Sequence, residues 1–166
     1  TPPGAPAPTM KSLDQIEPRI AVQSLAAAPP YTLSAPGSYY LTGNIIVASG
    51  NAISITTHGI TLDLNGFTIS STANPASGHA IQLGSGIHNV AISNGHIRSG
   101  TTLSGSTFTP LGFSGGIGSV ASNNTSVDIH RLTISGIAGS GIVLGISLSN
   151  SVSHCTVDTA SSLGIY

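Results

Sequence analysis

Nine charged side chains in 166 residues, four Lys or Arg and five Asp or Glu, leave this chain with a net charge of −1. That composition excludes nucleic-acid binding of the ordinary kind, which needs a basic stripe to neutralise phosphates. It also excludes a polybasic membrane-surface protein, and no apolar run approaches the ~20 residues of a membrane span. The only cysteine, Cys155, excludes an intrachain disulfide, and we interpret it as a small core or turn residue rather than a link between chains.

Residues 1–30 are predicted to form a proline-rich arm and a short capping helix. Ser12 has the chemistry of a helix start and Pro18 ends the helix, so that Leu13 and Ile16 share one face that covers an end of the core. The chain begins with Thr and a proline-rich stretch, which is typical of a mature end left by signal-peptide removal; a truncated chain is the alternative. We therefore expect an extracellular or cell-surface protein.

Residues 31–166 are predicted to form a stack of repeats with a loose period of about 23 to 28 residues. A strand, a Pro-Gly turn and a second strand open this region at 31–41. Short strands with period-two alternation follow, separated by Gly, Ser, Asn and Thr, which indicates a solenoid with one face of each strand inward. One inward column is predicted to contain Ile53, Ile81, Ile117, Ile142 and Ile165.

A second strand in each repeat is predicted at 62–64, 90–92, 127–129 and 152–154. This alignment places His154 at an inward position. A third inward column then reads Ile69, Ile97, Ile134 and Thr159, beside an outward column of Thr68, His96, Thr133 and Asp158 that is too mixed for an ice-binding face. Asn65 and Asn94, each followed by Gly, fit corners that need a positive φ. Residues 101–115 are predicted to be a loop that protrudes from the stack.

The runs at 31–41, 60–69 and 89–97 resemble a right-handed parallel β-helix of the pectate-lyase-like superfold, and are most similar to secreted parallel β-helix repeat proteins of environmental bacteria. The resemblance covers about four-fifths of the chain. It implies an all-β fold but no particular activity, since this superfold includes lyases, hydrolases, adhesins and structural proteins.

Asp63 and Asp128 are predicted to share an outward column two turns apart, at a Cα separation of ~9.6 Å. That spacing is permissive for an inverting glycoside hydrolase. The Asn-Thr-Asp, Asp-Asp, Gly-His-Gly and Arg-Ile-Lys motifs of galacturonase-type β-helix enzymes are nevertheless missing from the sequence. We therefore assign no catalytic residue, interpret both residues as solvated strand residues, and keep a glycoside hydrolase or polysaccharide lyase open as an alternative.

Candidate ligand-binding residues are Arg98 and the loop aromatics Phe108 and Phe113. An Arg with few acids around it does not make a calcium site, and the six histidines lack paired-ligand spacing, so neither metal nor cofactor is predicted. Asn123 and Asn124 each begin an N-glycosylation pattern, whose use the sequence leaves open.

The neutral, Ser/Thr/Gly-rich composition favours a non-catalytic structural protein that assembles with itself head to tail in a matrix, fibre or surface layer. The residues predicted to associate are Leu13 and Ile16 of the arm with Ile142, Leu144, Ile165 and Tyr166 of the last turn. The apolar segment before residue 30 is expected either to cap its own first turn or to reach the end of a neighbour. Two alternatives remain: a protein that binds or degrades extracellular polysaccharide, and a fragment of a longer surface adhesin.

Overall fold

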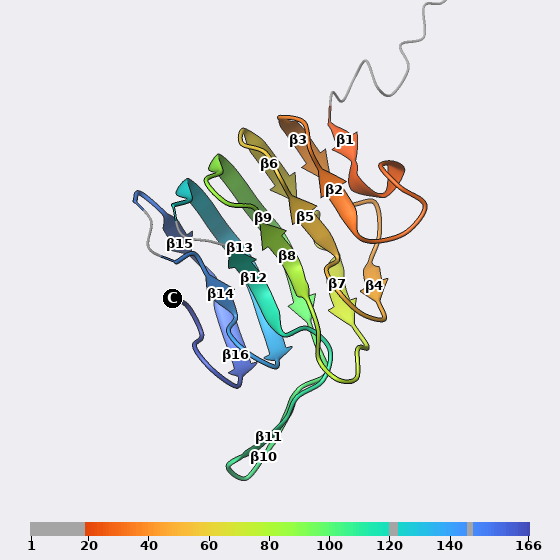
Figure 1. Cartoon of the computed structure of the whole chain (residues 1–166), viewed down its shortest axis with the longest axis vertical. Coiled ribbons are helices and arrows are strands. Elements are labelled where there is room, and N and C mark those ends of the chain that lie inside the picture. The colour runs from red at the N-terminus through yellow and green to blue at the C-terminus, as the bar shows by residue number, and fades with distance from the viewer. Residues whose placement is uncertain (1–18, 120–122, 146–147) are drawn as a thin grey trace, which may run out of the picture.

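The computed structural model describes residues 19–119, 123–145 and 148–166, and this part of the chain is all-β (Figure 1). Parallel strands stack in three walls, and the chain passes through the walls in turn. The first wall holds β2 (Tyr31–Leu33), β5 (Ile53–Ile55), β8 (His79–Leu83), β12 (Gly115–Ser119) and β14 (Ile142–Val143). This passage through the walls produces the repeat seen in the sequence.

The second wall holds β1 (Ile20–Ala21), β3 (Gly37–Tyr40), β6 (Ile60–Asp63) and β15 (Ser151–Ser153). The third holds β4 (Ile45–Val47), β7 (Thr68–Ser71) and β16 (Thr156–Ala160). Two longer strands, β9 (His88–Arg98) and β13 (Thr125–Ile137), pair first with the second wall and then with the third. The two walls therefore form one continuous sheet.

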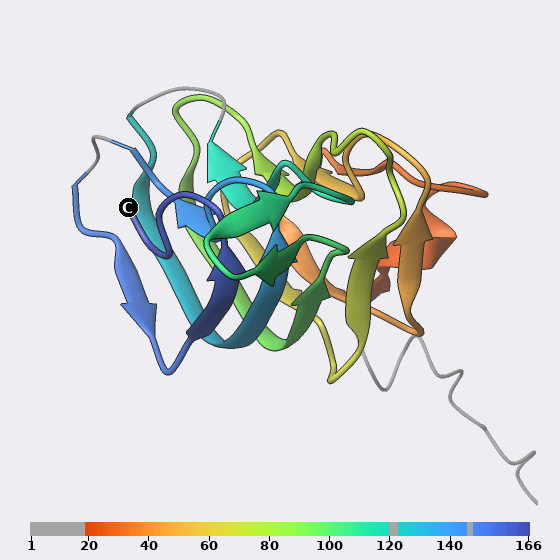
Figure 2. The same cartoon turned by 90° about the horizontal axis from the view of Figure 1, so that it is seen from below.

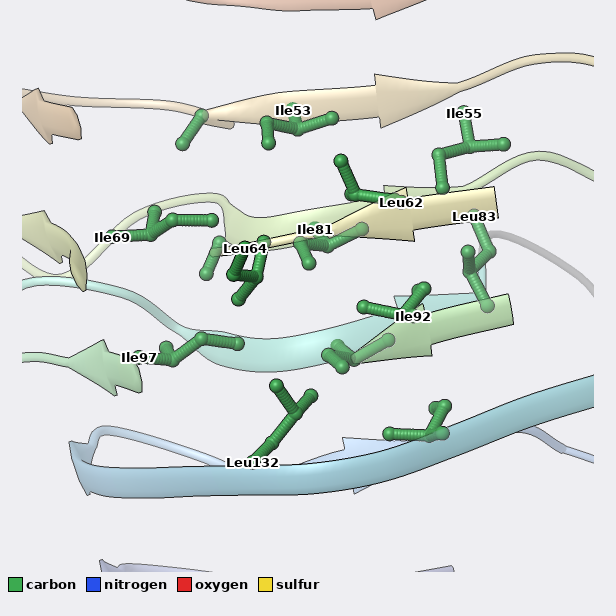
Figure 3. Packing of buried hydrophobic residues seen from close by; sticks show 14 of the residues in the cluster. Ile53, Ile55, Leu62, Leu64, Ile69, Ile81, Leu83, Ile92, Ile97 and Leu132 are labelled. Atoms are coloured by element: carbon green, nitrogen blue, oxygen red, sulfur yellow. The ribbon is translucent and has the colours of Figure 1, made fainter. Parts of the chain in front are cut away.

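The inward column predicted for the first wall is confirmed by the strand register. Each member pairs in parallel with the next: Ile53, Ile81, Ile117, Ile142 and Ile165. The first four are fully buried, whereas Ile165 is 49% exposed. Side chains from different walls meet in one interior, as Leu64 and Ile81 show in Figure 3. Each buried Leu or Ile stabilises the fold by roughly 1.5–3 kcal/mol, so these columns hold the stack together.

The corner between the second and third walls is a column of residues with positive φ. Asn65 (φ 53°) and Asn94 (φ 59°) confirm the prediction made for these two asparagines. Arg131 (φ 54°) and His154 (φ 51°) occupy the same corner in the following turns. The predicted inward position of His154 is therefore wrong: the register pairs Val152 with the core residue Ile129, and His154 is exposed at the corner.

The predicted shared column of Asp63 and Asp128 is also wrong. Asp63 pairs with Ser93, and Ser93 pairs with His130, whereas Asp128 pairs with Ala91. The physical reason is a longer corner in one turn: five residue steps separate Asp63 from Thr68, but three separate Ser93 from His96.

Leu64 occupies this longer corner as a fully buried core residue, rather than as the end of a strand. In the next turn Gly95 makes room for it, because a Cβ atom there would lie 2.4 Å from the Cβ of Leu64. The sequence shows the Leu-Asp-Leu alternation of a strand at 62–64, and this pattern displaced the predicted register by two residues.

The last turn carries a second register error. Val157 pairs with Ile134, so it replaces Thr159 in the predicted inward column. Thr156 pairs with Thr133 and replaces Asp158 in the outward column. That outward column on the third wall therefore reads Thr68, His96, Thr133 and Thr156.

The N-terminal end of the described chain caps its own stack. β1 pairs with β3, and Val22, in the 3₁₀ turn η1 (Val22–Ser24), is fully buried. Gln23 donates from Nε2 to the carbonyl of Gly43 (2.9 Å) and accepts from the Thr42 N–H (3.1 Å). The segment before residue 30 was expected either to cap its own first turn or to reach the end of a neighbouring copy. Its described part caps its own first turn. The predicted helix at 12–17, with Leu13 and Ile16, lies outside the described residues.

A β-hairpin protrudes from the stack between the third wall and β12 (Figures 1 and 2). It consists of β10 (Thr102–Ser104) and β11 (Thr107–Thr109), which pair antiparallel. The predicted loop at 101–115 is thus confirmed only in part: Phe113 is fully buried in the core, and Gly115 already belongs to β12. Within the described segments no helix is long and apolar enough to cross a membrane.

Candidate functional site

Asp63 is held in the corner by three partners. Its Oδ2 accepts from Nη1 of Arg19 (3.3 Å), and its Oδ1 accepts from the Asn65 N–H (2.8 Å) and from Nδ2 of Asn94 (3.3 Å). Arg19 also lies over the ring of Tyr40, 4.9 Å from its centroid. These contacts fix two successive corners and the start of the described chain, which is a structural role for this carboxylate.

Asp128 lies on the outer side of the second wall and pairs with a histidine. Its Oδ2 is 3.0 Å from Nδ1 of His130, two residues along the same strand. Neighbouring strands contribute Ala91 and Ser151 at the register of Asp128, neither of which is acidic. Because Asp63 stands in another column, the two-turn alignment that made its spacing to Asp128 permissive for inverting hydrolysis is not present.

The loop aromatics lie in different environments. Phe108 is on β11 opposite Leu103 of β10 and is half-buried, so it stays on the hairpin as predicted. Phe113 is corrected from a ligand-binding candidate to a core residue. Its N–H donates to Oγ of Ser99 (2.6 Å), which also donates to the Leu111 carbonyl (3.0 Å). The segment that returns from the hairpin is thereby fastened to the third wall.

Arg98, the third ligand-binding candidate, is exposed on the outer side of the third wall. It pairs in register with Ser70 on one side and Ser135 on the other. Two shallow hollows meet at Arg98 and Ser135. One, of about 280 Å³, continues to Thr68 and Thr133, and the other, of about 350 Å³, continues to Thr102 at the base of the hairpin. Of the predicted ligand-binding residues, Arg98 alone lines a hollow described here.

His79 is a half-buried histidine on the outer side of the first wall. Its ring lies against Gly115 and Gly118 of the next strand, where added Cβ atoms would each come within 2.4 Å of its Cδ2. Burial lowers the pKa of His79 from its usual value near 6.5. The neutral ring is therefore the form that fits this position.

Asn124 is fully buried, and both ends of its amide are used. Its Oδ1 accepts from the Ile87 N–H (3.0 Å) and its Nδ2 donates to Oγ of Ser119 (2.9 Å). Glycosylation at Asn124 is therefore incompatible with the fold. Asn123 is exposed, with φ 92°.

The residues predicted to associate at the last turn divide into two groups. Ile142 and Leu144 are buried (0% and 5% exposed), because the final segment pairs with them through backbone hydrogen bonds. Ile142 thus lies inward, as predicted for its column, and neither of these two side chains is available at the surface for association. Ile165 and Tyr166 are 49% and 66% exposed, and Leu148 and Leu163 in the same end region are 75% and 49% exposed.

No three His, Cys, Asp or Glu side chains gather into a possible metal site among the described residues. In comparisons with known proteins, no family model matches the chain, and neither a curated protein nor a solved structure matches it. The candidate sites are therefore argued from the geometry of this chain alone.

Sequence reasoning missed several contacts of these regions. The Asp128–His130 pair had a usable signal, because two residues spaced by two on a strand point to the same side. No signal in the sequence pointed to the partner of Asp63, because Arg19 lies 44 positions away in a segment outside the repeats. Thr68, His96 and Thr133, which line the hollow beside Arg98, already shared a predicted outward column, but the sequence analysis did not associate this column with Arg98.

Proposed function

We propose that this chain is a right-handed parallel β-helix that serves as a non-catalytic structural protein and assembles with itself end to end. The parallel register of three walls supports the helical path, since strands of one wall recur after the chain has passed the other two. The proposal includes the extracellular location that the resemblance to secreted repeat proteins implies.

The distribution of exposed apolar side chains carries this proposal. In the described part, large apolar residues that are exposed lie at the two ends of the stack, with one exception on the hairpin. Ile20, Leu25 and Ile46 lie in the first turn, and Leu148, Leu163, Ile165 and Tyr166 in the last, while the exception is Leu103. The side walls between them present mainly Ser, Thr and other polar residues. Apolar surface that is confined to the ends favours contact between ends.

Strand edges supply the second element of the contact. The outer edges of β15 and β16 pair with no further strand among the described residues, and parallel strands offer unpaired N–H and C=O groups there. A copy whose first turn meets this edge can continue the ladders of the second and third walls. Such a contact uses two different surfaces, so it repeats without closing and produces filaments.

The experiment is sedimentation velocity over a range of concentrations, with negative-stain electron microscopy of the same samples. The wild-type chain is expected to form oligomers or filaments that persist at about 1 M salt, because apolar and backbone contacts are weakly screened. Leu148→Asp, at a 75% exposed position, and Ile165→Asp should both shift the chain to monomer.

Leu103→Asp is the matched control, because Leu103 is as exposed as Ile165 (51% against 49%) but lies on the hairpin. It should assemble like the wild type. A wild-type chain that stays monomeric at high concentration contradicts the proposal, as does assembly that Leu103→Asp abolishes and both end variants leave intact.

A further inference from the structure

The third wall presents a cation with no acidic neighbour. Arg19, by comparison, is paired with Asp63 and stacked on Tyr40. No carboxylate of the described residues pairs with Arg98. The acid in its own column, Asp158, is two strands away, since Arg98 pairs with Ser135 and Ser135 pairs with Asp158. Their Cα atoms are therefore two strand spacings (~9.6 Å) apart, with Ser135 between them in register.

Hydroxyl groups surround this guanidinium on both neighbouring strands. The hollow of about 280 Å³ is lined by Thr68 on one side and by Thr133 and Ser135 on the other, with His96 two residues before Arg98 on the same strand. The second hollow extends the surface past Thr102 to the base of the hairpin. Together they form a shallow, open surface in which one cation lies among donors and acceptors that carry no charge.

We propose that this surface binds an acidic saccharide, with Arg98 on the anionic group and the hydroxyls of Thr68, Thr133 and Ser135 on neighbouring sugar hydroxyls. A guanidinium offers paired N–H donors that match the two oxygens of a carboxylate or a sulfate ester. The hydroxyl side chains can both donate and accept, as a polyhydroxylated ligand requires. This binding goes beyond the proposed self-assembly and does not depend on it.

Because the surface offers a single exposed cation, we expect weak binding. The class of sugar is identified by comparing the affinities of three related trisaccharides. Binding is measured by ¹⁵N–¹H correlation spectra during titration with three trisaccharides of galactose type: the galacturonate, the 6-sulfated and the neutral form. The two acidic probes separate the carboxylate from the sulfate source. At least one acidic form should bind tenfold or more tightly than the neutral form, shift amide signals of β7, β9 and β13, and lose affinity as salt is added.

Arg98→Gln should weaken binding of the acidic probe at least tenfold while leaving the melting temperature unchanged, because Arg98 is exposed. Arg131→Asn is the matched control: it removes an exposed Arg from the corner, where the preceding turn already has Asn94 at positive φ. It should change affinity less than twofold.

Three results would overturn the proposal. The first is a neutral probe that binds as tightly as the acidic ones. The second is that no probe shifts the amide signals of the third wall, and the third is an equal loss of affinity in the two Arg variants. The last result would mean that only the net charge of the chain attracts the ligand. None of these readouts involves the end surface, so they are separate from the test of self-assembly.

Discussion

The ring of His79 on β8 lies over Gly118 on β12, at a position where an added Cβ atom would come within 2.4 Å of the ring's Cδ2. Gly115, on the same strand, faces the same ring equally closely. Glycine at these two positions is therefore a packing requirement of the next turn. The histidine and the glycines act as one unit of the first wall.

Gly118→Ala is expected to lower the free energy of unfolding by about 1–3 kcal/mol, because the methyl group and the ring compete for one volume. In a His79→Ala background the same change should cost much less, since the competing ring is gone. Urea denaturation measures the four proteins of this cycle. Gly43→Ala is the control, because nothing lies within 4 Å of its added Cβ. Equal costs in both backgrounds would show that the ring is not the obstacle.

Stability should fall as the pH drops below about 6.5, in part because of His79. Burial lowers the pKa of its ring in the folded state, so the unfolded chain binds a proton at a pH where the folded chain does not. This destabilisation by His79 is absent above the pKa that the ring has in the unfolded chain. It grows as the pH falls toward the lower pKa of the folded chain, and it levels off below that value. His79→Gln should lose less stability than the wild type between about pH 7 and about pH 5. Parallel curves for the two proteins would contradict this assignment.

Asp63 and Asp128 should differ in their effect on stability. Asp63→Ala removes an ion pair and two hydrogen bonds at a corner and should cost about 1–3 kcal/mol. Asp128→Ala removes one exposed pair with His130 and should cost less than about 1 kcal/mol. Thermal and urea unfolding of both variants test the order. A larger loss for Asp128→Ala would reverse the roles argued for the two carboxylates.

Substitutions of Phe113 in the core and of Phe108 on the hairpin should differ in their effect on stability. Phe113→Ala empties a fully buried site and is expected to cost about 3–5 kcal/mol, whereas Phe108→Ala should cost about 1 kcal/mol or less. Replacing residues 102–109 with a short Gly-Ser linker should leave the stack folded, because loop length adds little closure entropy. Circular dichroism melts of the three variants provide the measurement. Unfolding of the linker variant would show that the hairpin supports the stack.

The sequence was sufficient to predict the Ile columns, because period-two alternation and a repeated Ile leave only one inward register in the first wall. It was also sufficient for the corners at Asn65 and Asn94, where a positive φ favours Asn. It was insufficient where two local patterns compete. Leu64 continues an apparent strand but lies in a longer corner, which shifted the predicted position of Asp63.

Phe113 shows a second limit. It lies in a Gly- and Ser-rich insertion, and nothing in the neighbouring residues distinguishes a buried aromatic from an exposed one. Its position depends on the contacts of Ser99 with the returning chain, which only the tertiary structure brings together. The surroundings of Arg98 were predicted in part, since the outward column expected from the repeats already contained Thr68, His96 and Thr133. The hollow itself could not be predicted, because it depends on how side chains of β7, β9 and β13 pack beside one another.

Cryo-electron microscopy of the assembled wild-type chain would show which surfaces join neighbouring copies. If copies join end to end, the strands should run across the filament, and the ~4.8 Å spacing of the parallel ladders should continue along its axis from the last turn of one copy to the first turn of the next. The hairpins should then project from the side at regular intervals. Copies joined through their hairpins or side walls, with the last turn facing solvent, would contradict the account.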